Sequence, residues 1–446
     1  MASAAEQLAA NLNFGAFNKA TELKKRLWFT LGALIVYRLG TYIPLPGIDP
    51  VILQDIFRQQ AGGILGMFNM FAGGALGRMT IFALNIMPYI SAAIIMQLMT
   101  SISPSMAQLK KEGAQGQKKI NQYTRYLTVL IAAMQAYGIA VGIEGMRGSG
   151  GAAVMEPGVF FRFTAVVTLV GGTMFLMWLG EQITARGVGN GISLIIFAGI
   201  VAELPSALAG TLELGRTGAI SSGIIMGILI MAILVIYGIV FVERAQRRLV
   251  VQYPKRQQGN KMYGGESSHL PLKLNTSGVI PLIFASSLLL MPTTVISFMA
   301  NSGPEWLTTI SSLLGRGQPS YLIIYSVLIA FFAFFYTAVV FNPEETADNL
   351  KKHGGFLPGI RPGKNTAVYL EYVTTRLTVV GSVYLVAVAL LPEILISNWS
   401  VPFFFGGTSL LIVVTVTMDT VAQVQSHMLA HQYEGLINKS RLKGRR

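Results

Sequence analysis

Few residues of this sequence combine a type and a spacing that could perform chemistry. His427 and His431 lie four residues apart, so on a helix their imidazoles would share one face and could bind one metal ion. No third ligand lies near them, and an exposed face of a C-terminal helix accounts for the pair without a metal. We therefore predict no metal site and no cofactor.

The glycine-rich stretch RGVGNGIS, at 186–193, resembles a phosphate-binding loop in its glycine content alone. It lacks the strand, turn and helix context that gives such glycines their role in holding phosphate. A flexible turn into the following apolar segment is the simpler interpretation, and we predict no nucleotide site here.

Acidic residues give no catalytic pattern either. Asp419 is the only Asp inside the predicted membrane segments, and it lies near the inner end of the last one. Intramembrane aspartyl catalysis needs two carboxylates, and ion-coupled pumps also place acids at membrane depth. Because we find no second carboxylate at depth, we predict that the protein is not an enzyme.

The elements that must position any site are membrane helices. The 446 residues are 52% hydrophobic and 12% charged, whereas soluble globular proteins carry about 25% charged residues. Cysteine is absent, which excludes disulfides and thiolate chemistry. A spanning helix needs about 20 mostly apolar residues, and ten segments, of which the fifth is short, meet this need. They cover 27–43, 80–100, 123–142, 160–180, 188–205, 219–242, 277–299, 320–341, 375–392 and 405–425.

Lysine and arginine set the predicted orientation. If the N-terminus lies inside, 27 of the 34 Lys and Arg residues fall in inside segments, as the positive-inside rule requires. Ten spans return the C-terminus to the inside, so both termini are predicted to be cytoplasmic. No cleaved signal peptide is predicted in residues 1–20. The exceptions to the charge bias are Arg38, Arg58, Arg78, Arg147, Arg162, Arg216 and Arg316.

Two pairs of short motifs indicate an internal repeat. IMPYISA at 86–92 matches VIPLIFA at 279–285, and GISLII at 191–196 matches GTSLLI at 407–412. The first pair relates segments two and seven, and the second relates segments five and ten. Two halves of five segments run in opposite directions, and such inverted repeats place their working site near the bilayer midplane.

The motifs pair isoleucines at that predicted site. Ile90 matches Ile283, Ile196 matches Ile412, and Ile86 lies one helical turn from Ile90. Secondary transporters also use inverted repeats, but they need polar or charged groups to hold a solute and its coupling ion. A transporter stays open as the alternative function, and the apolar lining disfavours it.

Two inside loops are long and basic. Loop 243–276 contains LVVQY, a QQGN turn and KMY, which together predict a projecting hairpin. Loop 342–374 presents Arg361 within GIRPG, where proline and glycine restrict the backbone. Positive charge on the inside alone would explain the composition, but the stiffened arginine and the hairpin favour a docking surface for a partner.

Long stretches of the chain resemble the SecY family, the protein-conducting channels of bacterial general secretion. The resemblance implies an all-α polytopic membrane protein with ten transmembrane helices in two inverted halves of five, plus a short re-entrant plug helix. It runs nearly the whole length, although residues 1–20 contribute little. The stretches are FNMFAGGALGRMTIFALNIMPYISA, GTMFLMWLGEQIT followed by GVGNGIS, VERAQRRLVVQYPKRQQGNKMYGGESSHLPLK, GVIPLIFASS, FFYTAVVFNPEETADNLKKHGGFLPGIRPG and VPFFFGGTSLLIVV.

The resemblance implies a role for each candidate residue. A tight apolar pore ring, which resists wetting, falls on Ile86, Ile90, Ile196, Ile283 and Ile412. The apolar stretch at 62–79 is too short to span, and the resemblance makes 62–76 the plug; an ordinary external amphipathic helix is the alternative. The plug residues are Ile64, Leu65, Met67, Phe68, Asn69, Met70 and Phe71.

Segments two and seven would form a lateral gate through which hydrophobic segments leave for lipid. Ser91 and Asn275 are the candidate gate residues, although each could equally make a helix cap or an interhelical hydrogen bond. A motor or ribosome would dock on Arg361, Arg256, Lys255, Arg247 and Arg248.

The implied partners are SecE, SecG, the SecA motor, the ribosome and YidC, with nucleic acid only as ribosomal RNA. Secretory and membrane polypeptides would be the substrates, and the location would be the bacterial inner membrane, in contact with its lipids. The domains would be a cytoplasmic segment at 1–26, a first half at 27–205, a second half at 206–425 and a basic cytoplasmic tail at 426–446.

Overall fold

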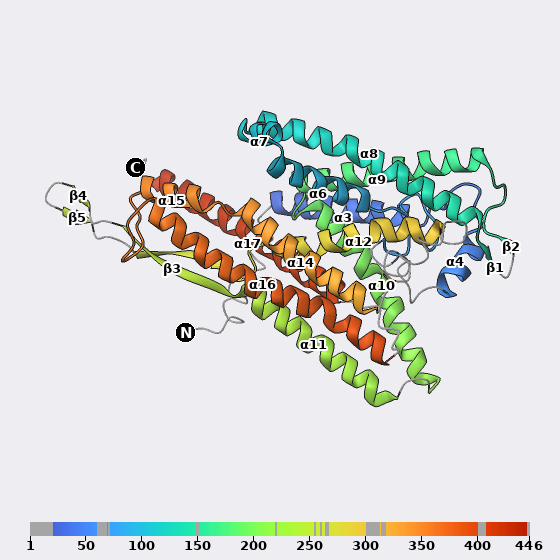
Figure 1. Ribbon diagram of the computed structural model, residues 1–446. Helices are drawn as coiled ribbons and strands as arrows, with labels where there is room; N and C mark the ends of the chain where they lie inside the picture. The colour runs from blue at the N-terminus through green and yellow to red at the C-terminus, as the bar shows by residue number, and fades with distance from the viewer. Residues whose placement is uncertain are drawn as a thin grey trace. The chain divides into compact units, whose positions relative to one another are not determined.

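Helices make up most of the protein (Figure 1). The computed structural model describes residues 21–59, 69, 72–148, 151–218, 221–253, 256–258, 261–263, 267–299, 313, 318–399 and 407–443. The chain forms two compact units. Unit 1 comprises residues 1–210, 290–315 and 416–446, and unit 2 comprises residues 211–289 and 316–415.

The helices follow one another along the chain with few strands between them. The first seven are α3 (Thr21–Gly40), α4 (Pro50–Gln59), α6 (Met87–Ile102), α7 (Pro104–Lys111), α8 (Ala114–Glu144), α9 (Val159–Arg186) and α10 (Gly191–Arg216). The others are α11 (Ser222–Arg244), α12 (Ile280–Met299), α14 (Pro319–Val340), α15 (Pro343–Lys352), α16 (Lys364–Trp399) and α17 (Gly407–Lys443).

Every predicted membrane segment overlaps one of these helices. Among the described residues, seven helices are long and apolar enough to cross a membrane, or eight if the bent pair α6 and α7 counts as one span. The remaining two predicted segments overlap α3 and α12. The number of helices is therefore consistent with the ten predicted spans.

The second predicted segment, 80–100, becomes helical only at Met87, so the prediction is wrong over 80–86. Met79 and Asn85 have φ angles of 44° and 50°, in the left-handed region where a helix of L residues cannot continue. The amide of Ile81 donates instead to the carbonyl of Ile43 at 3.1 Å. Hydropathy alone cannot distinguish this buried coil from a helix.

The fifth segment is longer than predicted. Helix α10 runs for 26 residues and continues past Pro205. A proline inside a helix removes one backbone hydrogen bond without necessarily ending the helix. The short prediction of 188–205 is corrected accordingly.

Unit 1 is built on close helix contacts. Helix α6 packs on α8, α8 packs on α9, and α3 packs on α9. A Cβ atom added to Gly172 of α9 would overlap the carbonyl oxygen of Ile81, and one added to Gly191 of α10 would overlap that of Gly180. Glycine is therefore needed where these backbones touch. A short pair, β1 (Arg147–Gly148) with β2 (Gly151–Ala152), completes this part.

Unit 2 carries two antiparallel strand pairs. Strand β3 (Gln246–Gln252) pairs with β6 (Ser267–Lys273), with Leu249 opposite Leu270, and β4 (Arg256–Gln258) pairs with β5 (Lys261–Tyr263). The predicted hairpin exists, but its pairing is corrected: KMY pairs with RQQ, and LVVQ pairs with the more distant SSHLPLK segment. Hydrogen bonds at the base of the loop thus extend the hairpin beyond its predicted strands.

The two long basic loops, 243–276 and 342–374, form one hydrophobic body with the start of α16. Leu249 and Leu272 of the strands pack in one core with Ala347 of α15, Leu357 and Leu370. Gln252 and Phe356 also exchange two backbone hydrogen bonds, at 2.9 and 3.0 Å. Helix α15 packs on α16, and α14 and α16 run side by side (Figure 1). We call this assembly of β3, β6, α15, the loop at 353–363 and the start of α16 the inner body, after the side of the membrane on which it is predicted to lie.

Replacing Leu370 by Ala tests the core of the inner body. Leu370 is fully buried, whereas Val368 of the same helix is 58% exposed. Because truncation of a buried leucine leaves a cavity and costs about 2–5 kcal/mol, Leu370→Ala should lower the midpoint of thermal unfolding in detergent. Val368→Ala is the control and should change it little. Equal midpoints for the two variants would contradict this packing.

Candidate functional site

The structure gives the repeat-related isoleucines matching places in their helices. Ile90 and Ile283 each lie three residues after the first residue of α6 and α12. Ile196 and Ile412 each lie five residues after the first residue of α10 and α17. Local structure therefore agrees with the motif pairing.

All five isoleucines of the predicted ring are buried. Ile86 precedes the first helical residue of α6, and its carbonyl accepts a hydrogen bond from the amide of Ile90 at 3.1 Å. Ile86, Ile90 and Ile196 belong to unit 1, and Ile283 and Ile412 belong to unit 2. Burial agrees with an apolar lining, and the ring itself stays a prediction.

The two candidate gate residues differ in their surroundings. Ser91 is buried in the first turns of α6. Asn275 lies before α12, where its Nδ2 donates to Glu243 Oε1 at 2.7 Å and to the carbonyl of Gly278 at 3.1 Å. The hydroxyl of Ser277 donates to Asn275 Oδ1 at 3.0 Å. Asn275 therefore links the end of α11 to the turn that starts α12.

Only one predicted plug residue, Asn69, lies within the described residues. Its side-chain oxygen accepts a hydrogen bond from the amide of Gly77 at 2.6 Å, and its carbonyl accepts one from Gly74 at 2.9 Å. Asn69 thus fixes the start of the chain that leads to α6. The other predicted plug residues, Ile64, Leu65, Met67, Phe68, Met70 and Phe71, lie outside the described residues.

The chain from Ala72 to Met79, here called the connecting segment, is a compact buried turn structure. Gly73 and Gly74 have φ angles of 63° and 80°, which only glycine adopts readily. A Cβ atom on Gly73 would lie 2.9 Å from the Cα of Gly199 in α10. The backbone of the connecting segment therefore lies directly against that helix.

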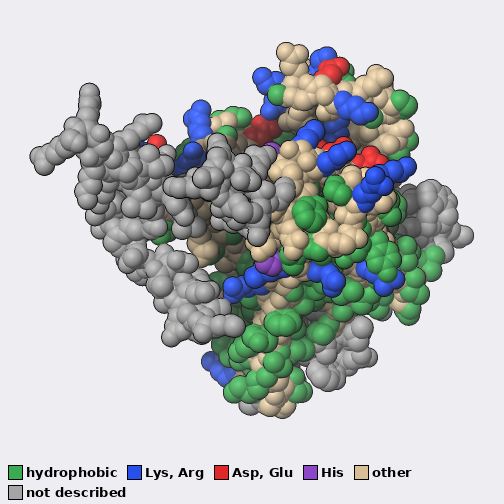
Figure 2. Space-filling view, turned by 90° about the vertical axis from the view of Figure 1, so that its left-hand side faces the viewer, with side chains coloured by type: hydrophobic (Ala, Val, Ile, Leu, Met, Phe, Trp, Pro, Cys, Tyr) green, Lys and Arg blue, Asp and Glu red, His purple; other side chains and the backbone are tan. Residues whose placement is uncertain are grey.

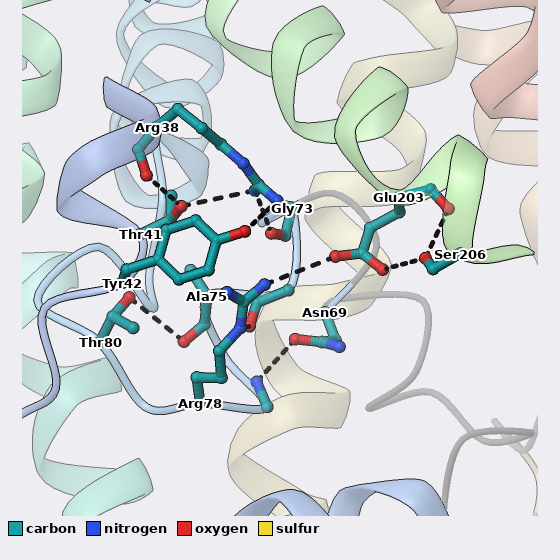
Figure 3. Close-up of polar contacts among 12 residues, drawn as sticks. Arg38, Thr41, Tyr42, Asn69, Gly73, Ala75, Arg78, Thr80, Glu203 and Ser206 are labelled. Carbon is teal, nitrogen blue, oxygen red and sulfur yellow. Dashed lines mark hydrogen bonds and ion pairs between the residues drawn. The ribbon is translucent and has the colours of Figure 1, made fainter. Parts of the chain in front are cut away.

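Two arginines form a polar cluster at this segment, and the sequence did not predict it (Figure 3). Arg38 Nη1 donates to the carbonyl of Gly73 at 2.8 Å, and its Nη2 donates to the Tyr42 hydroxyl at 3.1 Å. Arg78 lies over the Tyr42 ring, 4.3 Å from its centre, and its Nη2 is 3.8 Å from Glu203 Oε1. We call Arg38, Tyr42, Arg78 and Glu203 the arginine cluster.

The distribution of basic residues along the sequence already singled out two members of this cluster. Arg38 and Arg78 belong to the seven basic residues predicted on the outer side. Each outer arginine whose side chain the structure describes has a partner: Arg162 pairs with Glu144 at 2.6 Å and Arg216 with Glu213 at 2.9 Å. The arginines that the charge pattern predicts on the outer side, where their side chains are described, therefore make specific contacts.

The predicted docking arginines lie on the inner body. Arg247 and Arg248 are exposed on β3, and Arg361 is exposed in a loop bounded by Gly359 and Gly363, whose φ angles are 80° and 104°. The carbonyl of Arg361 accepts a hydrogen bond from the Thr366 hydroxyl at 3.1 Å. For Arg256 only the backbone, in β4, is described, and Lys255 lies outside the described residues.

Figure 2 views the end where β3 and α15 lie in Figure 1, and Lys and Arg side chains are prominent there. Among the described residues, Arg247, Arg248 and Arg361 have no ion pair with an acidic residue. Such unpaired cations suit contact with phosphate or with an acidic protein surface.

The glycine-rich loop at 186–193 holds its amides by internal hydrogen bonds. The amide of Val188 donates to Thr30 Oγ1 at 3.0 Å, and that of Gly189 donates to Gln423 Oε1 at 2.9 Å. The amide of Gly191 donates to Thr184 Oγ1 at 2.9 Å. A phosphate would need these donors free, so the loop instead joins the start of α10 to α3, α9 and α17.

The described residues contain no group of three or more His, Asp or Glu side chains that could hold a metal ion. The side chain of His427 is exposed, and that of His431 lies outside the described residues.

Comparisons with known proteins place this geometry in a family. The sequence pattern of the SecY family matches residues 80–421. The protein translocase subunit SecY of Escherichia coli K12 is 57% identical over 424 residues, which cover 95% of this chain and 96% of that protein.

Solved structures of protein-conducting channels share the fold. One protein-conducting channel matches with a TM-score of 0.63 and 18% identity, over 91% of this chain and 92% of that one. Sec61 in the canine ribosome-channel complex matches with a TM-score of 0.60 and 18% identity, over the same shares. The predicted fold class, a helical polytopic membrane protein of the channel type, is confirmed.

Replacing Gly73 by Ala tests the contact with α10. A left-handed backbone costs a non-glycine residue about 1–2 kcal/mol, and the new Cβ would also press on Gly199. Gly113→Ala is the matched control, because Gly113 has a φ angle of 73° but open space around it. Gly73→Ala should lower the midpoint of thermal unfolding more than Gly113→Ala does. Equal shifts would show that no close contact exists.

Proposed function

The chain belongs to the SecY family of protein translocase subunits, and we propose that it forms the pore through which unfolded polypeptides cross the bacterial inner membrane. A secondary transporter, the alternative that the repeats left open, is set aside because the family is one of protein translocases. We propose no catalytic step, so the energy for transport comes from a motor, from translation or from the proton-motive force.

The observation that best supports the proposed pore is that its five isoleucines are buried. Ile90 with Ile283 and Ile196 with Ile412 occupy matching helix positions, as residues of an inverted repeat should. Together with Ile86 they would form a ring of branched side chains, stiff at χ1. A ring without hydrogen-bonding groups resists wetting by water and ions yet lets varied polypeptides slide past.

We propose that the other elements predicted from the sequence complete this pore. The plug at 62–76 would close the resting channel, and Ser91 and Asn275 would lie at a lateral gate formed by α6 and α12. The first half would comprise 27–205 and the second 206–425, between cytoplasmic segments at 1–26 and 426–446. Membrane segments would leave through the gate into lipid.

We propose that the inner body is the docking surface. Arg361, Arg247 and Arg248 are exposed on it, and Arg256 and Lys255 lie in the same loop. The SecA motor or the ribosome, through its RNA, would bind there, and the likeness to a channel solved with a ribosome supports the second partner. SecE, SecG and YidC are proposed as membrane partners, with both termini of the chain in the cytoplasm.

A single cysteine at Ile196 tests the pore, because the chain has no other cysteine. A secretory precursor that is arrested in transit and carries one cysteine should form a disulfide with Ile196→Cys, and a disabled signal sequence should abolish it. Leu208→Cys, on the same helix but 44% exposed, is the control and should not cross-link. Absence of a disulfide in each of the variants Ile196→Cys, Ile283→Cys and Ile412→Cys, with engagement of the precursor verified, would refute the pore.

Replacing Arg361 by Glu tests docking. Loss of an exposed interface arginine removes about 2 kcal/mol or more of binding free energy at a hot spot, so translocation at limiting SecA should fall by about tenfold or more. Lys352→Glu makes the same charge change at the end of α15 and should have a much smaller effect. Equal losses would mean that only the net charge of the inner body matters.

A further inference from the structure

Glu203 supplies the carboxylate of the arginine cluster, and nothing in the proposed transport cycle uses it. It lies in α10, two residues before Pro205. The hydroxyl of Ser206 donates to the carbonyl of Glu203 at 2.8 Å and to its Oε2 at 3.2 Å. The next turn of the same helix therefore holds the carboxylate in place (Figure 3).

Arg78 joins this carboxylate to the connecting segment, of which it is part. Its Nη2 faces Glu203 Oε1 at 3.8 Å, its Nε donates to the carbonyl of Gly74 at 3.3 Å, and its guanidinium lies over Tyr42. The side chains of Arg78 and Glu203 are 23% and 28% exposed, respectively. Dissolved ions can therefore reach the pair and screen it.

The ion pair lies directly over the turn at Gly73 and Gly74. A Cβ atom on Gly74 would overlap both the Glu203 carboxylate and the Arg78 guanidinium. Because Arg78 moves with the connecting segment and Glu203 stays on α10, any displacement of the segment away from α10 must separate the two charges. The connecting segment follows the predicted plug and leads directly into α6, which carries Ile86 and Ile90.

We propose that Glu203 is a specificity-determining residue, whose ion pair with Arg78 latches the connecting segment on α10 and sets how strong a signal sequence must be to open the channel. The proposal rests on the proposed function for its consequence in transport. Its structural part, the latch itself, stands on the contacts of the arginine cluster alone.

The expected effect of the latch is modest and measurable. Partly exposed ion pairs shift an equilibrium by about two- to fivefold. Glu203→Gln removes the charge while an amide oxygen can still accept the Ser206 hydrogen bond, so the helix keeps its local structure. Glu213→Gln is the matched control, because Glu213 pairs with Arg216 at 2.9 Å within the same helix and so cannot latch another segment.

The first experiment measures release of the connecting segment directly, with the full chain in membrane vesicles. Ala75 is fully buried, so Ala75→Cys should react slowly with a membrane-impermeant maleimide. Glu203→Gln should speed this labelling by about two- to fivefold, and Glu213→Gln should not. High salt should speed labelling in the parent and leave the Glu203→Gln variant nearly unchanged, which a merely structural role would not produce.

A double-variant cycle checks that the two charges act on each other. If Glu203 acts only through Arg78, then Arg78→Gln with Glu203→Gln should label at the same rate as Arg78→Gln alone. Labelling of Glu203→Gln at the parent rate, or additive effects of the two substitutions, would overturn the latch.

The second experiment measures transport of a precursor whose signal sequence has been weakened. Glu203→Gln should raise its translocation by a factor similar to the labelling increase, whereas an intact precursor should be transported at the parent rate. Faster labelling without this relaxed selection would overturn the role in specificity and leave the proposed function intact. Failure of the parent to transport any precursor would refute the proposed function, and the labelling result would still decide the latch.

Discussion

Buried backbone polar groups must find hydrogen-bond partners, and unit 1 depends on meeting this requirement outside its helices. Residues 72–86 are buried and almost free of helix, so their amides and carbonyls cannot satisfy each other through an i to i−4 ladder. Some of them bond within short turns, as the amide of Met79 does to the carbonyl of Leu76. Others bond to neighbouring chain: Leu45 donates to the carbonyl of Met79, and Ile81 donates to that of Ile43. Arg38 supplies the donor for Gly73. The end of α3 and the residues that follow it therefore satisfy part of this segment's backbone.

Among the described residues, arginines on the predicted outer side have partners within the chain, whereas those of the inner body have no ion pair with an acidic residue. The predicted outer arginines whose side chains the structure describes each have a partner. Arg78 with Glu203 and Arg162 with Glu144 join separate helices or segments, whereas Arg216 pairs with Glu213 within α10. On the inner body, Arg247, Arg248 and Arg361 are exposed and have no acidic partner among the described residues. Paired charges fix the fold, whereas unpaired ones suit a binding surface whose partner is charged.

The motif pairing and the helix positions support the same inverted repeat. Short apolar motifs match by chance easily, but Ile90 with Ile283 and Ile196 with Ile412 also share their offset from the start of a helix. The offset follows from proline at the second helical position in α6 and α12 and from glycine at the first position in α10 and α17. These residues favour helix starts, so the sequence positions the isoleucines locally.

The sequence by itself determined the helices, their number, the isoleucine pairs and the basic inner loops, because apolar length, local start signals and charge bias are properties of neighbouring residues. Tertiary structure alone decided the path of residues 80–86, the pairing of LVVQ with SSHLPLK and the arginine cluster. Each of these depends on groups far apart in the chain: Ile81 with Ile43, Leu249 with Leu270, and Arg78 with Glu203. Hydropathy gives the same value to a buried coil and a buried helix, and only the partner of each backbone amide tells them apart.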